Sequence, residues 1–222
     1  MLNTVFRSMA RAIIADDHPI FRAAIKQALG ETLESEVLEA SSFTQLESLL
    51  KQNPQLELVF LDLSMPGNEG LTSLTLLRSQ FPDVLVVIVS ANENAHIIRQ
   101  AMALGASAYI PKSVPLPEWA AAVETVLAGD NWLPEGLVDL TETDQEVVNF
   151  ARSLESLTPQ QLKVLKAIAD GRLNKQIAFD LGVQETTIKQ HVSAILRKLH
   201  CVNRTQAGIL FRQMLSASDT LE

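Results

Sequence analysis

The chain has 222 residues, of which 47% are hydrophobic and 20% charged, a composition that excludes a disordered or fibrous protein. Its formal net charge of −8 is unevenly distributed: residues 1–129 and 130–156 each carry −6, whereas residues 157–222 carry +4. Only the basic last segment is therefore suited to binding a polyanion.

No apolar run is long enough to cross a bilayer, and no apolar signal-peptide core follows the first basic residues. We therefore expect a cytoplasmic protein that does not contact a membrane. The single cysteine, Cys201, excludes an intramolecular disulfide and a cysteine-based metal cluster, and we expect it to act as a small buried hydrophobe.

Apolar strand-like runs alternate with helical patterns over the first 127 residues. The predicted strands cover residues 11–15, 36–40, 58–61, 84–89 and 108–110, and the predicted helices cover residues 19–29, 43–50, 71–78, 94–104 and 116–127. Five strand-helix repeats with short loops predict an α/β domain, with a parallel sheet covered by helices on both faces. Right-handed crossovers favour the flavodoxin-like, doubly wound strand order 2-1-3-4-5.

Polar side chains follow four of these strands at the carboxyl end. They are Asp16 and Asp17 after the first strand, Asp62 after the third, Ser90 after the fourth and Lys112 after the fifth. In a parallel sheet these ends meet at one edge, around the switch point between strands one and three, where open α/β sheets bind their ligands.

Three carboxylates at one edge repel one another unless a cation lies among them. Oxygen ligands that are open to water on one side suit Mg²⁺. Asp62 could then be phosphorylated, with Lys112 balancing the charge on the phosphoryl group and the Ser90 hydroxyl donating a hydrogen bond to it. The alternative is that Lys112 and Asp62 form a plain ion pair and that Ser90 only ends a strand. The occurrence of suitable polar residues at five loop positions would then be a coincidence.

From residue 157 onward the pattern is wholly helical. Thr158 and Pro159 begin a first helix that ends at Gly171, and a second helix runs from Asn174 to Gly182. A turn over residues 183–186 leads to a third helix that ends near residue 199. One face of this third helix is apolar, and the opposite face presents Lys189, Gln190, Ser193 and Arg197. Two short helices joined by a tight turn, the second with a polar and basic stripe, predict a helix-turn-helix that fits a DNA major groove, although a solvated helix face would show the same stripe.

The acidic segment between the two parts is interpreted as a linker, with a possible helix over residues 142–154. We hypothesise that its acids rest against the basic C-terminal face and weaken DNA binding before activation. The residues concerned are Asp139, Glu142, Asp144 and Glu146.

The segments IIADDHPIFR, VFLDLSMPG, VIVSA and GASAYIPKS resemble the receiver domain of two-component response regulators of the NarL/FixJ subfamily. The resemblance implies that Asp62 accepts a phosphoryl group from a sensor histidine kinase and that Lys112 and Ser90 contact this group. It also implies a Mg²⁺ site made by Asp16, Asp17, Asp62 and the backbone carbonyl of Ser64. Tyr109 would be the aromatic switch that turns inward when Ser90 does.

Residues 157–207 resemble the LuxR-type DNA-binding domain that follows such receivers. The resemblance implies that Lys189, Gln190 and Ser193 face the bases and that the last helix, residues 203–215, mediates dimerisation. Candidates for phosphate contacts are Asn174, Lys175, Thr187, Arg197 and Lys198. One departure is Gln161, where the family usually carries glutamate, which makes the acidic helix-stabilising contact at that position doubtful.

The sequence thus predicts a receiver domain over residues 1–129 (core about 9–129), an acidic linker over residues 130–156, and an all-α helix-turn-helix domain over residues 157–222. The expected function is not enzymatic: phosphorylation of Asp62 would favour a homodimer that binds a double-stranded DNA operator and regulates transcription. Two rivals remain. A phosphatase of the haloacid-dehalogenase type needs a second carboxylate two residues after the nucleophile, where this chain has Ser64. A receiver that is never phosphorylated usually lacks one of the acidic pair or the lysine, and this chain has them all.

Overall fold

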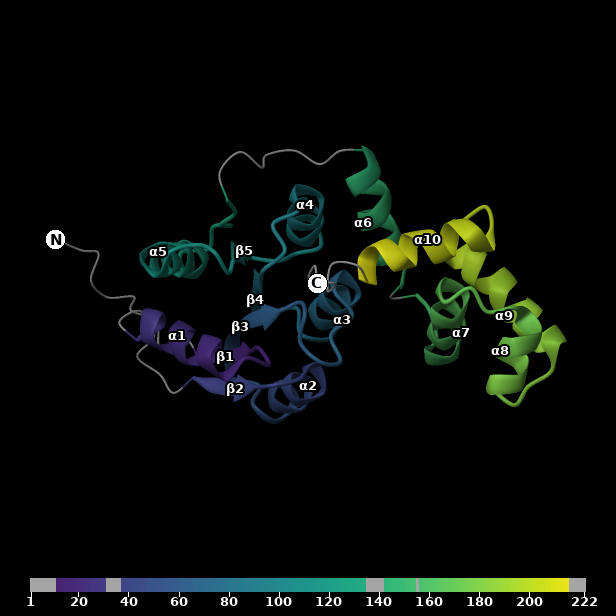
Figure 1. The fold of residues 1–222 in the computed structure, drawn as a ribbon, viewed down its shortest axis with the longest axis horizontal. Helices are drawn as coiled ribbons and strands as arrows, with labels where there is room; N and C mark the ends of the chain where they lie inside the picture. Colours follow the sequence, from purple (N-terminus) through teal and green to yellow (C-terminus); the bar gives the residue numbers. More distant parts are fainter. Residues whose placement is uncertain (1–10, 31–36, 135–141, 155, 216–222) are drawn as a thin grey trace.

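The computed structural model describes residues 11–30, 37–134, 142–154 and 156–215 (Figure 1). Its centre is one parallel sheet whose strand order, β2-β1-β3-β4-β5, confirms the predicted topology. The strands are β1 (Arg11–Ala15), β2 (Leu38–Ala40), β3 (Leu56–Asp62), β4 (Leu85–Ser90) and β5 (Ala108–Pro111). The predicted second strand began at residue 36, whereas β2 begins at Leu38 and residue 36 lies outside the described part of the chain.

Helices cover both faces of the sheet, because alternate strand residues point to opposite sides. One face is covered by α1 (Pro19–Leu29) and α5 (Leu116–Leu127), and the other by α2 (Phe43–Gln52), α3 (Leu71–Gln80) and α4 (Ala95–Ala103). Ile14 and Phe60 pack under α1 and α5, whereas Ile13 and Val59 pack on the other side. The sheet is therefore buried on both faces, as its unbroken apolar strands predict.

Local signals in the sequence fix where these helices begin. Pro19 occupies the first turn of α1, where a missing N–H is harmless. The side chain of Ser42 accepts a hydrogen bond from the Gln45 N–H at the start of α2, and that of Asn94 accepts one from the His96 N–H at the start of α4. These caps place the strand-to-helix loops at the edge of the sheet that carries Asp62.

The C-terminal part is helical throughout. Its helices are α6 (Glu142–Leu154), α7 (Pro159–Ala169), α8 (Asn174–Asp180), α9 (Glu185–Lys198) and α10 (Arg204–Leu215). α6 contacts α3 and α4 on one side and α10 on the other (Figure 1). Because Val148, Ala151 and Leu154 are buried there, the apolar core under α2, α3 and α4 continues through α6 into the C-terminal helices.

This packing corrects the hypothesis for the linker acids. Asp144 is buried against His96, Arg99 and Gln100 of α4, and so does not rest on the basic C-terminal face. The apolar residues next to Asp144 on α6 are buried, so Asp144 is buried with them. The side chains of α4 supply the hydrogen-bond donors that its carboxylate needs. Glu146 accepts a hydrogen bond from the neutral Gln206 of α10, whereas Asp139 and the side chain of Glu142 lie outside the described residues. No helix within the described residues is both long and apolar enough to cross a membrane.

Candidate functional site

Four strand ends bring the predicted polar residues to one edge of the sheet. Asp62 is the last residue of β3 and Ser90 the last of β4, and both are buried. Asp16 follows β1, where its N–H donates to the Ala40 carbonyl of β2 (3.0 Å). Lys112 follows β5, and its N–H donates to the Ser90 carbonyl (2.8 Å). The backbone of the sheet itself therefore positions the site.

The ammonium of Lys112 lies between two buried carboxylates. Its Nζ is 2.7 Å from Oδ2 of Asp16 and 3.0 Å from Oδ2 of Asp62, and each aspartate is only 1% exposed. Burial raises the pKa of Asp62 above its usual value, although the Ser64 N–H and Lys112 act in the opposite direction. Burial opposes the charge on Lys112, but its ion pairs with Asp16 and Asp62 outweigh this and raise its pKa. One cation thus holds together two carboxylates that would otherwise repel each other.

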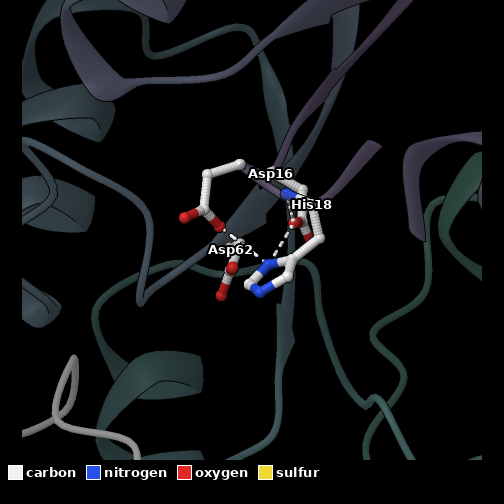
Figure 2. A group of neighbouring side chains, drawn as sticks. Asp16, His18 and Asp62 are labelled. Carbon is white, nitrogen blue, oxygen red and sulfur yellow. Dashed lines mark hydrogen bonds and ion pairs between the residues drawn. The ribbon is translucent and has the colours of Figure 1, made fainter. Parts of the chain in front are cut away.

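His18 belongs to this cluster, and the sequence reasoning assigned it no role. Its Nδ1 lies 3.2 Å from Oδ1 of Asp16 and 2.8 Å from Oδ1 of Asp17. Figure 2 shows the imidazole turned toward the carboxylates of Asp16 and Asp62. The position directly after the two aspartates was a signal that would have found it.

The donor set fits a hard divalent cation. Asp16, Asp17, His18 and Asp62 each offer a ligand atom, and these atoms all lie within 4.8 Å of one another. Oδ2 of Asp16 and Oδ1 of Asp17 are buried, and they lie 2.7 Å from the Lys112 ammonium and 2.8 Å from the His18 imidazole, respectively. Buried carboxylate oxygens of this kind need a cation, and Mg²⁺ prefers few carboxylates together with water. The carbonyl of Ser64 stays a predicted ligand; the N–H of Ser64 donates to Oδ1 of Asp62 (3.0 Å).

Aromatic side chains support Lys112 from the side of α1 and α5. Its Nζ lies 4.6 Å from the centre of the Phe21 ring, which meets Trp119 edge to face at 5.7 Å. A hollow of about 490 Å³ opens above the cluster. Its lining residues are His18, Ile20, Phe21, Asp62, Ser64, Ala91 and Lys112. The carboxylate of Asp62 is therefore buried but can be reached from this hollow.

Tyr109 lies beneath the loop that follows Ser90, with its ring fully buried. Its hydroxyl donates to the carbonyl of Asn92 (2.6 Å), and the N–H of Asn92 donates to the Ser90 Oγ (3.1 Å). Burial raises the pKa of Tyr109 to about 12. The inward position is an observation, and the switch role stays a prediction.

The second site is the helix-turn-helix formed by α8 and α9. Ile188 and Ile195 of α9 are buried, and the residues predicted on the opposite face, Lys189, Gln190, Ser193 and Arg197, are exposed. Ser193 donates to the Lys189 carbonyl, and Lys189 pairs with Glu185 at 3.0 Å. The polar stripe of α9 is therefore on the surface and available to a groove.

The candidates for phosphate contacts differ in their exposure and in the hydrogen bonds that they already make within the domain. Lys175 is exposed and Thr187 is half-buried, whereas the Asn174 side chain accepts a hydrogen bond from Arg204 (3.0 Å). Lys198 donates to the Ser156 carbonyl (2.6 Å) and to the Gln161 Oε1 (2.8 Å). The ammonium of Lys198 is thus already engaged within the domain, and its predicted phosphate contact would require these bonds to break.

The departure at Gln161 is compensated by hydrogen bonds. Gln161 and Thr158 form a capping box: the Gln161 N–H donates to the Thr158 Oγ1, and the Thr158 N–H donates to the Gln161 Oε1. A capping box satisfies two N–H groups at the start of α7 without requiring a charge. The neutral amide therefore preserves the helix start that a glutamate would make.

Comparisons with known proteins agree with this geometry. Residues 12–124 match the family model described as "Response regulator receiver domain", and residues 155–211 match "Bacterial regulatory proteins, luxR family". The chain is 41% identical over 218 residues to the glycerol metabolism activator of Pseudomonas putida, covering 95% of this chain and 96% of that protein. It is 29% identical to the nitrate/nitrite response regulator protein NarL of Escherichia coli K12, covering 92% and 95% respectively. A structure of RcsB from Salmonella enterica serovar Typhimurium, bound to a promoter in the presence of the phosphomimetic BeF3-, is similar with a TM-score of 0.53 and 25% identity, covering 95% of this chain and 99% of that one.

The fold and the acidic cluster define a receiver domain, and the helices after it define a LuxR-type DNA-binding domain. The chain belongs to the response regulators that combine these two domains, and it is a two-component transcriptional response regulator.

Proposed function

We propose that Asp62 accepts a phosphoryl group from a sensor histidine kinase and that this reaction controls dimerisation and binding to a specific DNA operator. The observation that supports Asp62 most directly is the ammonium of Lys112, which lies within 3.0 Å of Asp62 at the floor of an open hollow. A carboxylate held beside a cation is suited to attack phosphorus, and the same cation then stabilises the charge on the transferred group.

The groups around Asp62 divide the work of this transfer. A carboxylate oxygen of Asp62 forms the new bond to phosphorus as the bond to the histidine nitrogen of the kinase breaks. Lys112 balances the charge on the phosphoryl oxygens, and the Ser90 hydroxyl donates a hydrogen bond to one of them. Ser90 and Tyr109 are both hydrogen-bonded to Asn92, so breaking the bond between Ser90 and Asn92 changes the surroundings of the already buried Tyr109 ring.

Asp16, Asp17 and Asp62, with the carbonyl of Ser64, are the groups that we propose hold Mg²⁺. When bound, Mg²⁺ offsets the negative charge of the carboxylates and of the incoming phosphoryl oxygens. His18 lies against Oδ1 of Asp16 and Oδ1 of Asp17, and so orients two of these carboxylates.

The C-terminal domain is proposed to read DNA through α9. Lys189, Gln190 and Ser193 would contact bases, and Arg197, Lys175, Thr187, Asn174 and Lys198 would contact phosphates. The exposure of the α9 stripe and the +4 charge of residues 157–222 support this assignment. The likeness to the glycerol metabolism activator of Pseudomonas putida supports activation of transcription as the outcome. We also propose a cytoplasmic location, because a regulator of this kind has to reach double-stranded DNA.

The domain boundaries that we propose are residues 1–129 for the receiver, 130–156 for the linker and 157–222 for the DNA-binding domain. The start of the capping box at Thr158 supports the second boundary. Dimerisation through α10 would align two copies of α9 with two half-sites of an operator, whose symmetry mirrors that of the protein.

The proposal is tested by measuring operator affinity before and after incubation with acetyl phosphate and Mg²⁺, with the operator first selected from random double-stranded DNA. We expect phosphorylated protein to bind as a dimer at least about tenfold more tightly, in line with typical coupling free energies. Asp62→Asn is expected to give no such change. Equal affinity of phosphorylated and unphosphorylated protein would contradict the proposal.

A further inference from the structure

Asp144 of α6 connects the linker helix to α4 through a buried carboxylate. Its side chain is 0% exposed. Oδ2 accepts a hydrogen bond from Arg99 Nε (3.0 Å), and Oδ1 accepts one from Gln100 Nε2 (3.0 Å) and lies 2.9 Å from Nδ1 of His96. Three side chains on one face of α4 thus converge on a single charged group of the linker.

This cluster makes the docking of α6 depend on the position of α4. A carboxylate buried without partners is strongly destabilising, so α6 is stable in this place only while α4 presents its donors. A second tie lies near the other end of the helix, where Arg152 donates to the Ala103 carbonyl (2.9 Å). The ion pair of Lys166 with Glu69 is a further tie between the two domains, and because it is only partly buried, water screens it more than the ion pair of Asp144 with Arg99.

A continuous series of hydrogen bonds joins Ser90 to this cluster. The Asn92 N–H donates to Ser90 Oγ (3.1 Å), the Asn94 N–H donates to Asn92 Oδ1 (2.9 Å), and the His96 N–H donates to Asn94 Oδ1 (2.9 Å). His96 then meets Asp144. Each link is a short side-chain turn, so a change at Ser90 alters the geometry of the next link and finally the start of α4.

On its other side α6 packs against α10. Glu146 of α6 accepts a hydrogen bond from Gln206 of α10 (3.3 Å), and Ala207 and Leu210 of α10 are buried. Because the family resemblance makes α10 the dimerisation helix, a docked α6 limits what α10 can contact.

We propose that Asp144 is a latch: it holds α6 on α4 in the unphosphorylated chain, and phosphorylation of Asp62 releases it through residues 90–96. When the Ser90 hydroxyl turns to donate to the phosphoryl group, it no longer accepts the Asn92 N–H, and the start of α4 shifts with the loop. The donors of α4 then leave the Asp144 carboxylate, which favours undocking of α6 and exposes α10 to a second copy. This inference rests on the proposed phosphorylation of Asp62.

Hydrogen exchange of the full-length chain, followed by mass spectrometry, tests the latch. Peptides covering residues 142–154 are compared with and without acetyl phosphate and Mg²⁺, and the mass of the intact protein is recorded on the same samples. We expect exchange in α6 to become at least about tenfold faster in phosphorylated protein, as local opening of a helix that has lost a buried ion pair requires.

Variants separate the latch from general destabilisation. Asp144→Ala and Asp144→Asn are expected to exchange quickly in α6 even without phosphorylation, whereas the matched control Gln145→Ala, which changes an exposed neighbour on the same helix, behaves as the parent. Asn94→Ala is expected to gain the phosphoryl mass while α6 no longer responds. Asn94→Asp, which keeps an acceptor at this position, is expected to restore the response.

Several results would overturn the latch. One is a phosphoryl adduct on the parent chain with unchanged exchange in α6, and another is slow basal exchange in both Asp144 variants. An α6 response that survives in Asn94→Ala would overturn the route through residues 90–96. Absence of the adduct itself would instead overturn the proposed phosphorylation, so the two failures are distinguishable.

Discussion

The Nζ of Lys112 lies 3.0 Å from Oδ2 of Asp62, although the two residues are 50 positions apart in the chain. The same ammonium is 2.7 Å from Oδ2 of Asp16, so a single cation serves two buried carboxylates. Lys112 therefore takes part of the role of a divalent cation while also standing where a phosphoryl group would need a positive charge.

The buried negative charge of Asp62, close to that of Asp16, lowers the stability of the fold. We therefore predict that Asp62→Asn stabilises the metal-free chain. Burial raises the folded pKa of Asp62 above its ordinary value of 3.8. For an acid with a raised pKa, the stabilising contribution is fully present below the unfolded pKa and is lost as the pH rises through the folded pKa. At pH 7 the variant should be more stable by about 1–2 kcal/mol, because a neutral isostere replaces a buried charge.

Urea unfolding at several pH values without Mg²⁺ checks this prediction. The difference between variant and parent should shrink as the pH falls through the raised pKa of Asp62 and be smallest below the ordinary value of 3.8, where this aspartate is neutral in the folded and the unfolded parent chain. Asp83→Asn, an exposed acid, is the control and should have little effect. Lower stability of Asp62→Asn at pH 7 would show that the ion pair with Lys112 outweighs the burial of the charge.

Tyr109 gives a direct optical test of the buried switch region, because it is the single tyrosine of the chain. With its pKa raised to about 12, it should ionise at a higher pH in folded protein than in unfolded protein, where tyrosine titrates near 10. The stability that this group contributes is present below pH 10 and is lost as the pH rises toward 12. Absorbance at 295 nm follows the titration, with Tyr109→Phe as the blank. Ionisation near pH 10 while circular dichroism still reports folded protein would contradict the burial of the ring.

Two exposed positions on α9, Gln190 and Arg197, should affect DNA binding differently. Gln190→Ala should weaken binding to the selected operator by about 1–3 kcal/mol and leave binding to random DNA almost unchanged, because base contacts carry the specificity. Arg197→Ala should weaken both and reduce the salt dependence by about one unit, as expected for a lost phosphate contact.

Fluorescence anisotropy at several salt concentrations measures these effects. Lys163→Ala, which removes an exposed basic residue of α7 away from the stripe, serves as the control for net charge. Equal losses of Gln190→Ala on operator and random DNA would contradict its assignment to the bases.

The sequence predicted the sheet and its polar edge well, because these depend on local patterns. The bounds of α1, α5 and α6 agree with the predictions, since Pro19, Gly129 and the periodic apolar residues of α6 are strong local signals. The predicted strand order also brought four polar residues to one edge of the sheet, because each lies at the carboxyl end of a strand. They are Asp16, Asp62, Ser90 and Lys112.

Contacts between distant helices could not be predicted in this way. Asp144 was interpreted as a linker acid facing basic residues, because its charge was visible in the sequence and its burial against Arg99 was not. Nothing local distinguishes it from the exposed acids of a connector; only the packing of α6 on α4 does. The hydrogen bond from Lys198 to Gln161 could not be predicted for the same reason, since the two residues lie on different helices.

The mass of the intact protein after incubation with acetyl phosphate and Mg²⁺ tests the central claim most directly. We predict a gain of one phosphoryl group by the parent chain, no gain by Asp62→Asn, and a shift of the phosphorylated parent toward dimer on a sizing column. An adduct that persists in Asp62→Asn would contradict the account. So would the absence of an adduct on the parent chain, in which Lys112 contacts Asp16 and Asp62 and Asp17 lies in the same acidic cluster.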